Sequence, residues 1–534
     1  MRFKQLLFLI TLLSLGLVSC KRKDPDPTPP PPTDRANLSR DSIFYYAKQV
    51  YLWNDALPTY DAFNPKKYTT ASTDFLNYEK ELIALTQYKI NPATGRAYEY
   101  YLNGTDSKYS YISDIANKNP TAFIPEKRSA VDLEGNGNDF GIKLGAYGQD
   151  DIGQEFALFV TAVYQNSPAD KAGVVRSHRI YKINDRTIGA SYPNDQAFIN
   201  TAFNATTIKI EGVKYTNGIS GVPYTVTLTK TVYKSSPIFA KKVFTAGAKK
   251  IGYLSYARFS NLNSNSKADL DLAFSEFSTA GVTDLIIDLR YNGGGYVNTA
   301  QYFINQIAPA SANGKVMFAE HYNALMQSGG AVILTNQPLL DANKKVQYQN
   351  GKMITYADIN YSVASNTEVF AKTGPLNTAS TITNVVFIVS GNTASASELM
   401  INSLKPYMTV KMVGTKTFGK PVGFFPITIE NKYEVYYSLF QTKNSLGQGD
   451  YFDGFTPDVV DDFDDPRNDF GDSNEHYIAV ARNLIAPGVS VTSAAKTMSI
   501  QGRSVSVQSL SPMKPIVDGN EFIGMIETRH KLKK

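Results

Sequence analysis

The stretch Asp284-Leu285-Ile286-Ile287-Asp288-Leu289-Arg290-Tyr291-Asn292-Gly293-Gly294-Gly295 joins an apolar run to three consecutive glycines. The apolar run predicts a buried strand over residues 285–289. Because glycine has no Cβ, the loop that follows lets backbone N–H groups approach a ligand without obstruction. Such groups can stabilise negative charge that develops on an oxygen atom during a reaction. Taken alone, the stretch is equally compatible with a tight turn between a strand and a helix.

A second predicted strand, over residues 385–389, leads into the hydroxyl-rich turn Ser390-Gly391-Asn392-Thr393-Ala394-Ser395-Ala396-Ser397. A helix follows and should reach Leu404, because Pro406 cannot continue it. A serine at the start of a helix usually does no more than cap it. The helix end favours negative charge on a serine Oγ but does not remove its proton, so a catalytic serine here requires a base from elsewhere.

A candidate for that base is Lys420, in the segment Gly414-Thr415-Lys416-Thr417-Phe418-Gly419-Lys420-Pro421-Val422-Gly423. This segment follows a third predicted strand at residues 410–413. Lys420 has only apolar residues and glycine next to it, and an apolar setting favours the neutral form of a lysine, which can accept a proton. Lys416 is better explained as a surface residue. The segment also resembles a phosphate-binding loop, but Pro421 stands where a Mg²⁺-holding Ser or Thr would be needed, which argues against nucleotide hydrolysis.

Residues 244–485 as a whole alternate strand-like and helix-like segments, including a predicted amphipathic helix at residues 267–280. This alternation predicts an α/β core in which crossover connections join the strands of a sheet that helices cover. The expected fold class is therefore a multidomain α/β and β protein. It combines this core with a smaller β domain and an N-terminal helical domain over residues 36–130.

Together these segments resemble the C-terminal processing (tail-specific) serine peptidases over roughly residues 139–485. The matching stretches occur in the family's order, at residues 288–295, 393–398, 417–420 and 454–458. The resemblance implies a serine endopeptidase in which Ser395 is the nucleophile and Lys420 the general base, acting through an acyl-enzyme. It further implies an oxyanion hole formed by the backbone N–H groups of Gly294 and Ala396, with Gly295 as the rival of Gly294, and neither a cofactor nor a metal.

One position departs from the family pattern. Many members carry a Gln four residues after the lysine, where it orients the amine, and this chain has Phe424. Lys420 must then be held by packing, by a backbone carbonyl or by another polar group, for which Asn292 and Glu398 are the candidates. The departure leaves open an alternative function, that of a catalytically weak or inactive peptide-binding lipoprotein of the cell envelope.

Residues 131–235 contain short β-rich runs and resemble a PDZ domain of the bacterial protease type. The segment Phe140-Gly141-Ile142-Lys143-Leu144 matches the carboxylate-binding loop, and Ser167-Pro168-Ala169-Asp170-Lys171-Ala172-Gly173 matches a short helix with its glycine stop. In such domains a peptide adds a strand to the sheet edge while backbone N–H groups hold its terminal carboxylate. Unfolded or C-terminal protein segments are thus the expected substrates, although the domain could instead act only as a lid.

The ends of the chain predict export and anchoring. Residues 1–19 have the charged start and the short apolar run of a signal peptide, and Leu17-Val18-Ser19-Cys20 resembles the lipoprotein cleavage box. We therefore expect lipidation of Cys20 and attachment to a membrane of the bacterial cell envelope, on the periplasmic side or at the cell surface. The proline-rich residues 20–35 form a linker. Residues 486–534 are expected to be a β-rich extension whose basic end is solvated.

Composition excludes several other classes. The 534 residues include one Cys and four His, too few for intramolecular disulfides, a Cys-built metal site or a His-rich one, and they leave little for a Ser-His-Asp triad. The formal net charge of +6 is weak for this length and argues against nucleic-acid binding. The 34 Tyr residues suggest carbohydrate binding as a weaker alternative, but no pair of carboxylates is placed for glycoside hydrolysis. The sequence leaves the oligomeric state open, and residues 36–130 reveal no pattern with chemistry.

Overall fold

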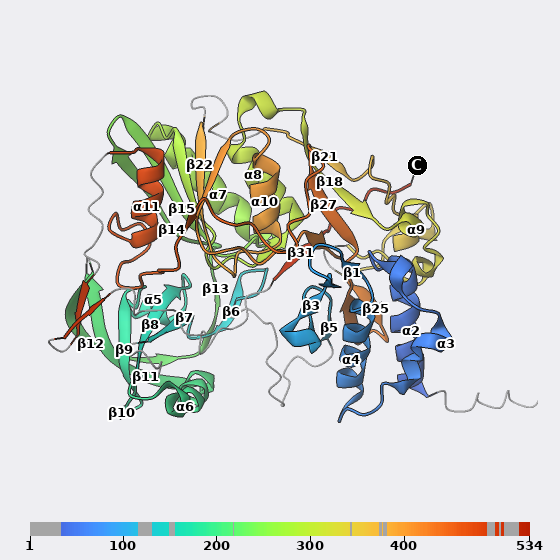
Figure 1. Cartoon of the computed structure of the whole chain (residues 1–534), viewed down its shortest axis with the longest axis horizontal. Helices are drawn as coiled ribbons and strands as arrows, with labels where there is room; N and C mark the ends of the chain where they lie inside the picture. The colour runs from blue at the N-terminus through green and yellow to red at the C-terminus, as the bar shows by residue number, and fades with distance from the viewer. Residues whose placement is uncertain are drawn as a thin grey trace, which may run out of the picture.

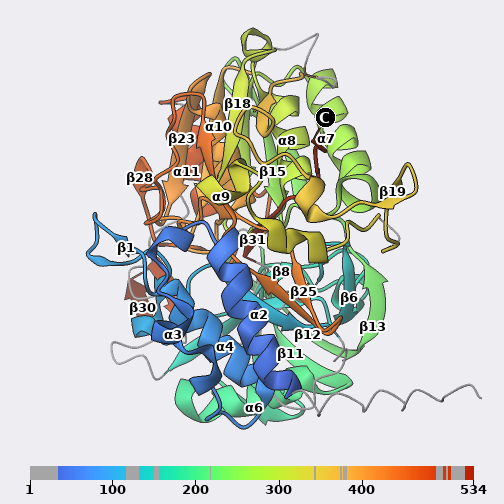
Figure 2. The same ribbon diagram turned by 90° about the vertical axis from the view of Figure 1, so that its right-hand side faces the viewer.

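The computed structural model describes residues 34–115, 131–148, 155–216, 218–341, 344–372, 376, 382–488, 497–500, 503–506 and 523–533. Figure 1 shows the parallel sheet with its helices at the upper left and a smaller β unit below it. The N-terminal helices lie at the lower right. The view in Figure 2, turned by 90°, places these N-terminal helices against the lower half of the molecule.

The central sheet has the strand order β14-β15-β16-β22-β23-β28. Its first pair is antiparallel and all other neighbours are parallel. Its strands are β14 Ile238–Ala246, β15 Lys249–Tyr256, β16 Asp284–Asp288, β22 Asn384–Val389, β23 Thr409–Gly414 and β28 Val459–Val460. The predicted buried strands and the α/β fold class are thereby confirmed.

Helices cover both faces of this sheet. Alternate residues of each strand point to opposite sides, so each face carries apolar side chains that pack against helices. On one face Leu285, Ile287 and Phe387 share a core with α7 Lys267–Thr279, α8 Val297–Ile307 and α10 Ala396–Leu404. On the other face Ile286, Val386 and Ile388 pack with α11 His476–Ile485. The carboxyl ends of β16, β22 and β23 therefore meet at one edge, which is where the three segments singled out in the sequence begin.

The smaller β unit is a sheet in the order β12-β11-β9-β8-β7, with the short β10 paired to β9. It has its own apolar core, which includes Leu144, Phe156, Ile199 and Phe203. Its elements are β7 Ile142–Gly148, β8 Phe156–Val163, α5 Pro168–Lys171, β9 His178–Ile183, β10 Arg186–Thr187, α6 Tyr192–Asn204, β11 Thr207–Thr216 and β12 Ile219–Thr229. The strand β7 ends the sheet, so no described strand pairs with its outer edge.

The N-terminal segment does not form a core of its own. Ile43, Phe44 and Val50 of α2 Arg35–Val50 and Leu82 of α4 Asp74–Thr86 belong to the same apolar cluster as β16 and β22. The strand β5 Tyr111–Asp114 extends a sheet made by β25 Ile427–Ile429 and β26 Tyr433–Tyr436. The helices expected in residues 36–130 are present, but they pack on the larger unit instead of standing apart from it.

The remaining strands form small sheets around these units. One is the sheet β21 Thr367–Val369, β18 Val316–Tyr322, β27 Phe440–Asn444 and β24 Val422–Gly423. The two-stranded pairs are β1 Ile90–Asn91 with β2 Arg96–Ala97, β3 Tyr100–Tyr101 with β4 Asp106–Ser107, β6 Asn136–Asp139 with β13 Thr231–Lys234, β19 Tyr348–Gln349 with β20 Lys352–Met353, and β29 Thr497–Ile500 with β30 Arg503–Ser506. Two further helices are α3 Tyr60–Phe63 and α9 Ala324–Gln327.

The end of the chain packs against the main core, although Lys531 and Lys533 are exposed, as expected of its basic end. Residues 524–526 form β31 Gly524–Ile526, which pairs in parallel with β17 Gly294–Tyr296. In both ribbon views β31 lies at the centre of the molecule, between the parallel sheet and the N-terminal elements. The apolar pattern Ile523-Gly524-Met525-Ile526 explains this burial, since Met525 is fully enclosed in the main core. Arg529 and Lys531, which follow β31, hold the segment in place through ion pairs with Glu368.

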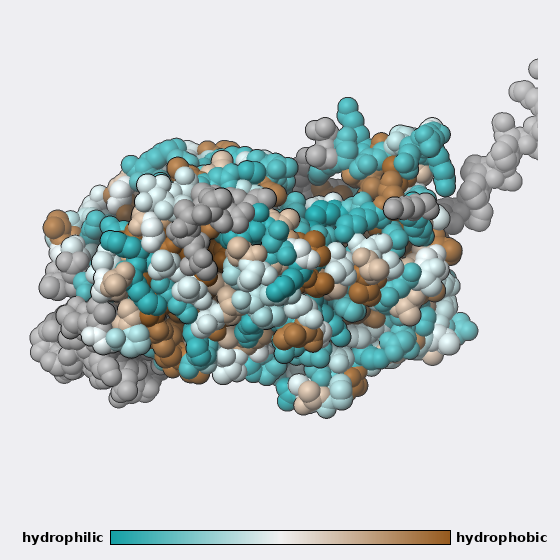
Figure 3. Space-filling view, turned by 90° about the horizontal axis from the view of Figure 1, so that it is seen from above, coloured by the Kyte–Doolittle hydropathy of each residue, from teal (hydrophilic) through white to brown (hydrophobic). Residues whose placement is uncertain are grey.

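The surface seen from above in Figure 3 mixes hydrophilic and hydrophobic residues in small groups. Within the part of the chain that the structure describes, no helix has both the length and the apolar character needed to cross a bilayer.

Candidate active site

Ser395 sits on a sharp turn between β22 and α10. Its backbone has φ 60° and ψ −111°, a conformation that residues other than glycine rarely adopt. The residue is completely buried. Backbone strain of this kind persists only where the surroundings enforce it, and it gathers at functional sites.

Glu398, one turn into α10, holds the turn in place. Its Oε2 accepts hydrogen bonds from the backbone N–H of Ser395 at 2.9 Å and of Lys420 at 2.8 Å. Its Oε1 accepts from the hydroxyl of Thr417 at 2.5 Å and from the N–H of Gly419 at 2.8 Å. Burial raises the pKa of Glu398, and the four hydrogen bonds it accepts oppose that rise. The carboxyl group therefore joins the turn at Ser395 to the loop that carries Lys420, residues 417–420, called the lysine loop below.

Lys420 is buried, as its apolar neighbours in the sequence predict. Its Nζ donates to the backbone carbonyl of Tyr109 at 3.3 Å and to that of Ile523 at 3.0 Å. It also lies 4.5 Å from the centre of the Phe424 ring. Of the possible means of orienting this amine, the structure uses backbone carbonyls and an aromatic face, the latter supplied by the residue that replaces the family's Gln. Glu398 contacts Lys420 through its backbone N–H.

Gly293, Gly294 and Gly295 form a loop, called the glycine loop below, that lies against Ser395. A Cβ built on Gly294 would fall 3.0 Å from Ser395 Cβ and 3.0 Å from the backbone nitrogen of Ala396. The N–H of Ala396 belongs to the first turn of α10, where backbone donors have no partner within the helix. The N–H of Gly294, however, donates to Asn292 Oδ1 at 2.9 Å. Asn292 therefore supports the glycine loop and does not orient Lys420, and its Nδ2 donates to the carbonyl of Tyr256.

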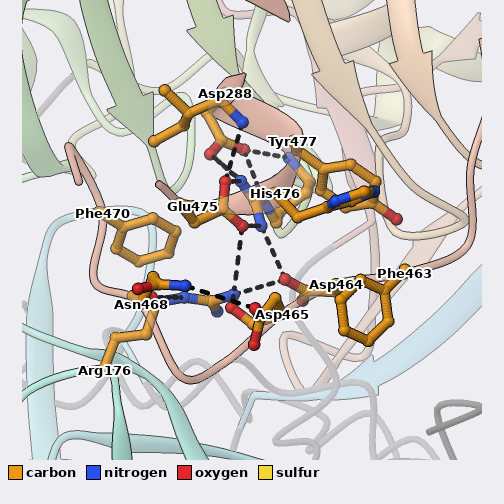
Figure 4. A network of polar contacts seen from close by, with 12 residues as sticks. Arg176, Asp288, Phe463, Asp464, Asp465, Asn468, Phe470, Glu475, His476 and Tyr477 are labelled. Carbon is orange, nitrogen blue, oxygen red and sulfur yellow. Dashed lines mark hydrogen bonds and ion pairs between the residues drawn. The ribbon is translucent and has the colours of Figure 1, made fainter. Parts of the chain in front are cut away.

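A buried ionic network anchors the base of this loop (Figure 4). Arg290 contacts Asp288 at 2.8 Å, Glu475 at 2.7 Å and Asp464 at 2.7 Å. Arg176, which belongs to the smaller β unit, reaches the same Asp464 and donates to the hydroxyl of Tyr291 at 2.9 Å. Burial by itself raises the pKa of Asp464, but the guanidinium groups of Arg176 and Arg290 outweigh it and hold the pKa below its usual range.

The PDZ-like loop, residues 140–144, belongs to the smaller β unit. Phe140, Ile142 and Leu144 are buried in the core of the smaller unit. Gly141 has φ +75°, and a Cβ there would fall 2.0 Å from Ser167 Cβ, so the position requires glycine. Its N–H donates to Asp139 Oδ1 at 2.8 Å. Lys143 lies 5.5 Å from the Tyr291 ring centre, which brings β7 next to the loop that leads to the glycines.

Two contributors were missed by sequence reasoning. Tyr109 accepts from Lys420 Nζ through its carbonyl, and its hydroxyl donates to the carbonyl of Gly419 at 2.6 Å. Ile523 supplies the second carbonyl to the same amine. Both meet the amine of Lys420 through backbone carbonyls, which leave no signature in the sequence. Cys20 and the signal peptide lie outside the described residues. Within the described residues, no cluster of three or more His, Cys, Asp or Glu could hold a metal ion.

Comparison with known proteins agrees with this architecture. Residues 250–461 match the model of peptidase family S41. The chain is 26% identical over 195 residues to the chloroplastic C-terminal processing peptidase of Tetradesmus obliquus, which covers 36% of this chain and 32% of that protein. It is 24% identical over 348 residues to a protein of Staphylococcus aureus (strain N315) named "Probable CtpA-like serine protease", covering 64% of this chain and 56% of the relative.

The chain thus spans between about a third and just over half of the length of these curated relatives. A crystal structure of a Bacteroides fragilis NCTC 9343 protein assigned to the S41 proteases superposes with a TM-score of 0.53 at 21% identity, covering 83% of this chain and 96% of that one. That likeness concerns the fold. Residues 250–461 of this chain are thus similar to peptidase family S41.

Proposed function

We propose that this protein is a serine endopeptidase of the C-terminal processing type that uses a Ser395/Lys420 dyad. One observation carries the proposal: Ser395 occupies a strained, buried turn, and a single carboxylate oxygen ties that turn to the loop of a buried lysine. A structural serine or lysine requires neither feature. The match of residues 250–461 to a peptidase family supports the same reading.

In the proposed reaction Ser395 Oγ attacks the carbonyl carbon of a peptide bond while Lys420 Nζ takes its proton. The N–H of Ala396 stabilises the negative charge on the carbonyl oxygen, together with Gly294 once its N–H turns from Asn292 Oδ1 to the substrate. Lys420 returns the proton to the leaving amine, and an acyl-enzyme remains. A water molecule that Lys420 deprotonates then hydrolyses the ester and frees the serine.

The strand β7 ends its sheet, and in the proposed capture of substrate an unfolded C-terminal tail adds a strand beside it. The signal sequence and Cys20 support an exported, lipid-anchored protein at the cell envelope.

The test is a casein cleavage assay with the purified chain from residue 34 onward. Ser395→Ala and Lys420→Ala should each lose cleavage. Two matched controls should retain it: Ser397→Ala, which removes a buried hydroxyl that donates to the carbonyl of Asn292, and Lys416→Ala, which removes a surface ion pair with Asp453. Cleavage that survives Ser395→Ala would exclude this nucleophile.

A second candidate is a tail-binding protein that does not cleave. Phe424 in the place of the family's Gln and the engagement of the Gly294 N–H by Asn292 favour it. Capture of a fluorescent C-terminal peptide by the purified chain, with no cleavage of that peptide or of casein, would identify this function.

A further inference from the structure

The last described segment of the chain, residues 523–533, crosses the candidate active site. The N–H of Gly524 donates to the carbonyl of Gly293 at 3.1 Å, and β31 pairs residue by residue with β17 in the glycine loop. On its other side, the carbonyl of Met525 accepts from the N–H of Phe424 at 2.9 Å, and the N–H of Glu527 donates to the carbonyl of Phe424 at 3.0 Å. The segment is therefore a strand between the glycine loop and the lysine loop.

This strand touches the proposed catalytic groups. Lys420 Nζ donates to the carbonyl of Ile523. The carbonyl oxygen of Gly524 lies 2.4 Å from the point where a Cβ on Gly294 would be, and the same point is 3.0 Å from the nitrogen of Ala396. The carbonyl oxygen of Gly524 thus lies next to Gly294, on the side of that residue that faces Ser395 and Ala396.

Peptidase substrates bind as extended strands that pair with the backbone of the enzyme, and each backbone group of an edge pairs with one strand at a time. In this structure β31 uses the carbonyl of Gly293 and both backbone groups of Phe424. An incoming peptide must displace β31 before it can pair with these groups.

The strand is held by charges that follow it. Arg529 pairs with Glu527 at 2.6 Å and with Glu368 at 3.4 Å, and Lys531 pairs with Glu368 at 2.9 Å. Glu527 and Glu320 are both buried, and Arg529 is the cation that faces them. Because an uncompensated buried carboxylate is strongly unfavourable, removing Arg529 should drive the strand out of its site.

We propose that β31 is an intramolecular pseudosubstrate: the C-terminal strand of the chain fills the substrate groove next to Ser395 and keeps the enzyme latent until it is displaced. This inference rests on the proposed function of the site. It assigns to residues 523–533 a regulatory role that the match to residues 250–461 does not cover.

Two variants release the strand in different ways. The double variant Arg529→Ala/Lys531→Ala removes the anchoring cations from the full chain, and a stop codon after residue 522 removes the strand itself. Lys241→Ala, which breaks a surface ion pair with Glu276, is the matched control. Hydrogen exchange at the backbone amides of residues 524–527 measures release, and casein cleavage measures activity, each repeated with Ser395→Ala.

We expect faster hydrogen exchange in the double variant. We also expect Ser395-dependent cleavage to rise by about tenfold or more in both release variants, because a groove that is open for less than a tenth of the time in the intact chain lowers its apparent activity by that factor. A synthetic peptide with the sequence of residues 523–529 should inhibit both release variants. Cleavage by the intact chain that does not change on release would overturn the inference and leave the proposed function standing.

If no variant cleaves casein, the proposed function fails and the groove is tested by binding. The labelled 523–529 peptide should then bind the truncated chain and not the intact one. Absence of binding to the truncated chain, with its fold verified by circular dichroism, would refute the pseudosubstrate role. Should the truncated chain not fold, the double variant alone decides the question.

Discussion

Ser395 and Lys420 donate their backbone N–H groups to the same atom, Oε2 of Glu398, at 2.9 and 2.8 Å. The two residues are 25 positions apart in the sequence and come from different loops, yet their backbones lie side by side. In the proposed mechanism Glu398 is therefore a positioning residue: its carboxylate fixes the backbones of the proposed nucleophile and the proposed base and takes no part in the reaction itself.

Glu398→Ala should lower kcat for casein by about 100-fold, because a displacement of about 1 Å between reacting groups has an effect of that order. KM should change little, since Glu398 contacts no substrate. The variant also leaves four donors without their acceptor, at about 1–3 kcal/mol for each buried group. The measurement is steady-state kinetics beside urea unfolding.

Glu398→Gln keeps an acceptor oxygen and should recover part of kcat, whereas Thr417→Val removes a single hydroxyl and should have a smaller effect. A Glu398→Ala variant that is destabilised but turns over at the parental rate would show a purely structural role.

Gly294→Ala keeps the backbone N–H but should displace it from the proposed oxyanion hole, and kcat should fall by about 100- to 1,000-fold, the range found when one oxyanion donor is lost. Gly294 has φ +110°, and the added Cβ would lie 3.0 Å from Ser395 Cβ and 2.4 Å from the carbonyl oxygen of Gly524. Gly391→Ala is the matched control, because it lies in the neighbouring turn and a Cβ there meets nothing within 4 Å. Equal activity of the two variants would remove Gly294 from the proposed oxyanion hole.

The sequence was sufficient to predict the elements that carry the site. Apolar runs at residues 285–289, 385–389 and 410–413 each became a parallel strand, and the hydroxyl-rich turn became the start of α10. These predictions succeeded because a strand buried on both faces is a continuous apolar run and glycines mark the turns.

The contacts between distant segments could not be predicted in this way. Tyr109 and Ile523 meet Lys420 through carbonyl groups that every residue has, so no side chain in the sequence identifies them. The basic end of the chain was expected to be solvated because chain termini are seldom tied down, and Lys531 is exposed, but ion pairs also hold this end in place. Its partners Glu320 and Glu368 lie more than 150 residues away, and only the fold brings them together.

Arg176→Met should lower the free energy of unfolding by about 3–5 kcal/mol, because it leaves the partly buried carboxylate of Asp464 and the buried carboxylate of Glu475 short of one cation. Urea unfolding followed by circular dichroism measures the loss. Adding Asp464→Asn to Arg176→Met should restore part of it. Arg186→Met, which breaks a half-exposed pair with Asp195, should cost no more than about 1 kcal/mol. Similar losses in the two single variants would contradict the importance of the network.

Glu81 provides a pH-dependent test of the N-terminal packing. It lies buried in α4, and burial raises its pKa to about 10, with Arg40 opposing the rise and Asp41 adding to it. A folded-state pKa above the unfolded value means that the folded protein holds this proton more tightly. The contribution of this proton to the free energy of unfolding is therefore complete below about pH 4.5, and it is lost as the pH rises toward 10.

Glu81→Gln stays neutral at every pH, so its advantage in unfolding free energy over the parent should grow with pH by up to about 1.4 kcal/mol per unit. Urea unfolding at pH 5, 7 and 9 measures this difference. Glu276→Gln, a partly exposed residue on α7, should show no comparable trend. Parallel stability profiles for the parent and Glu81→Gln would mean that Glu81 is ionised in the folded state, with its charge compensated by a cation such as Arg40, which acts on it electrostatically.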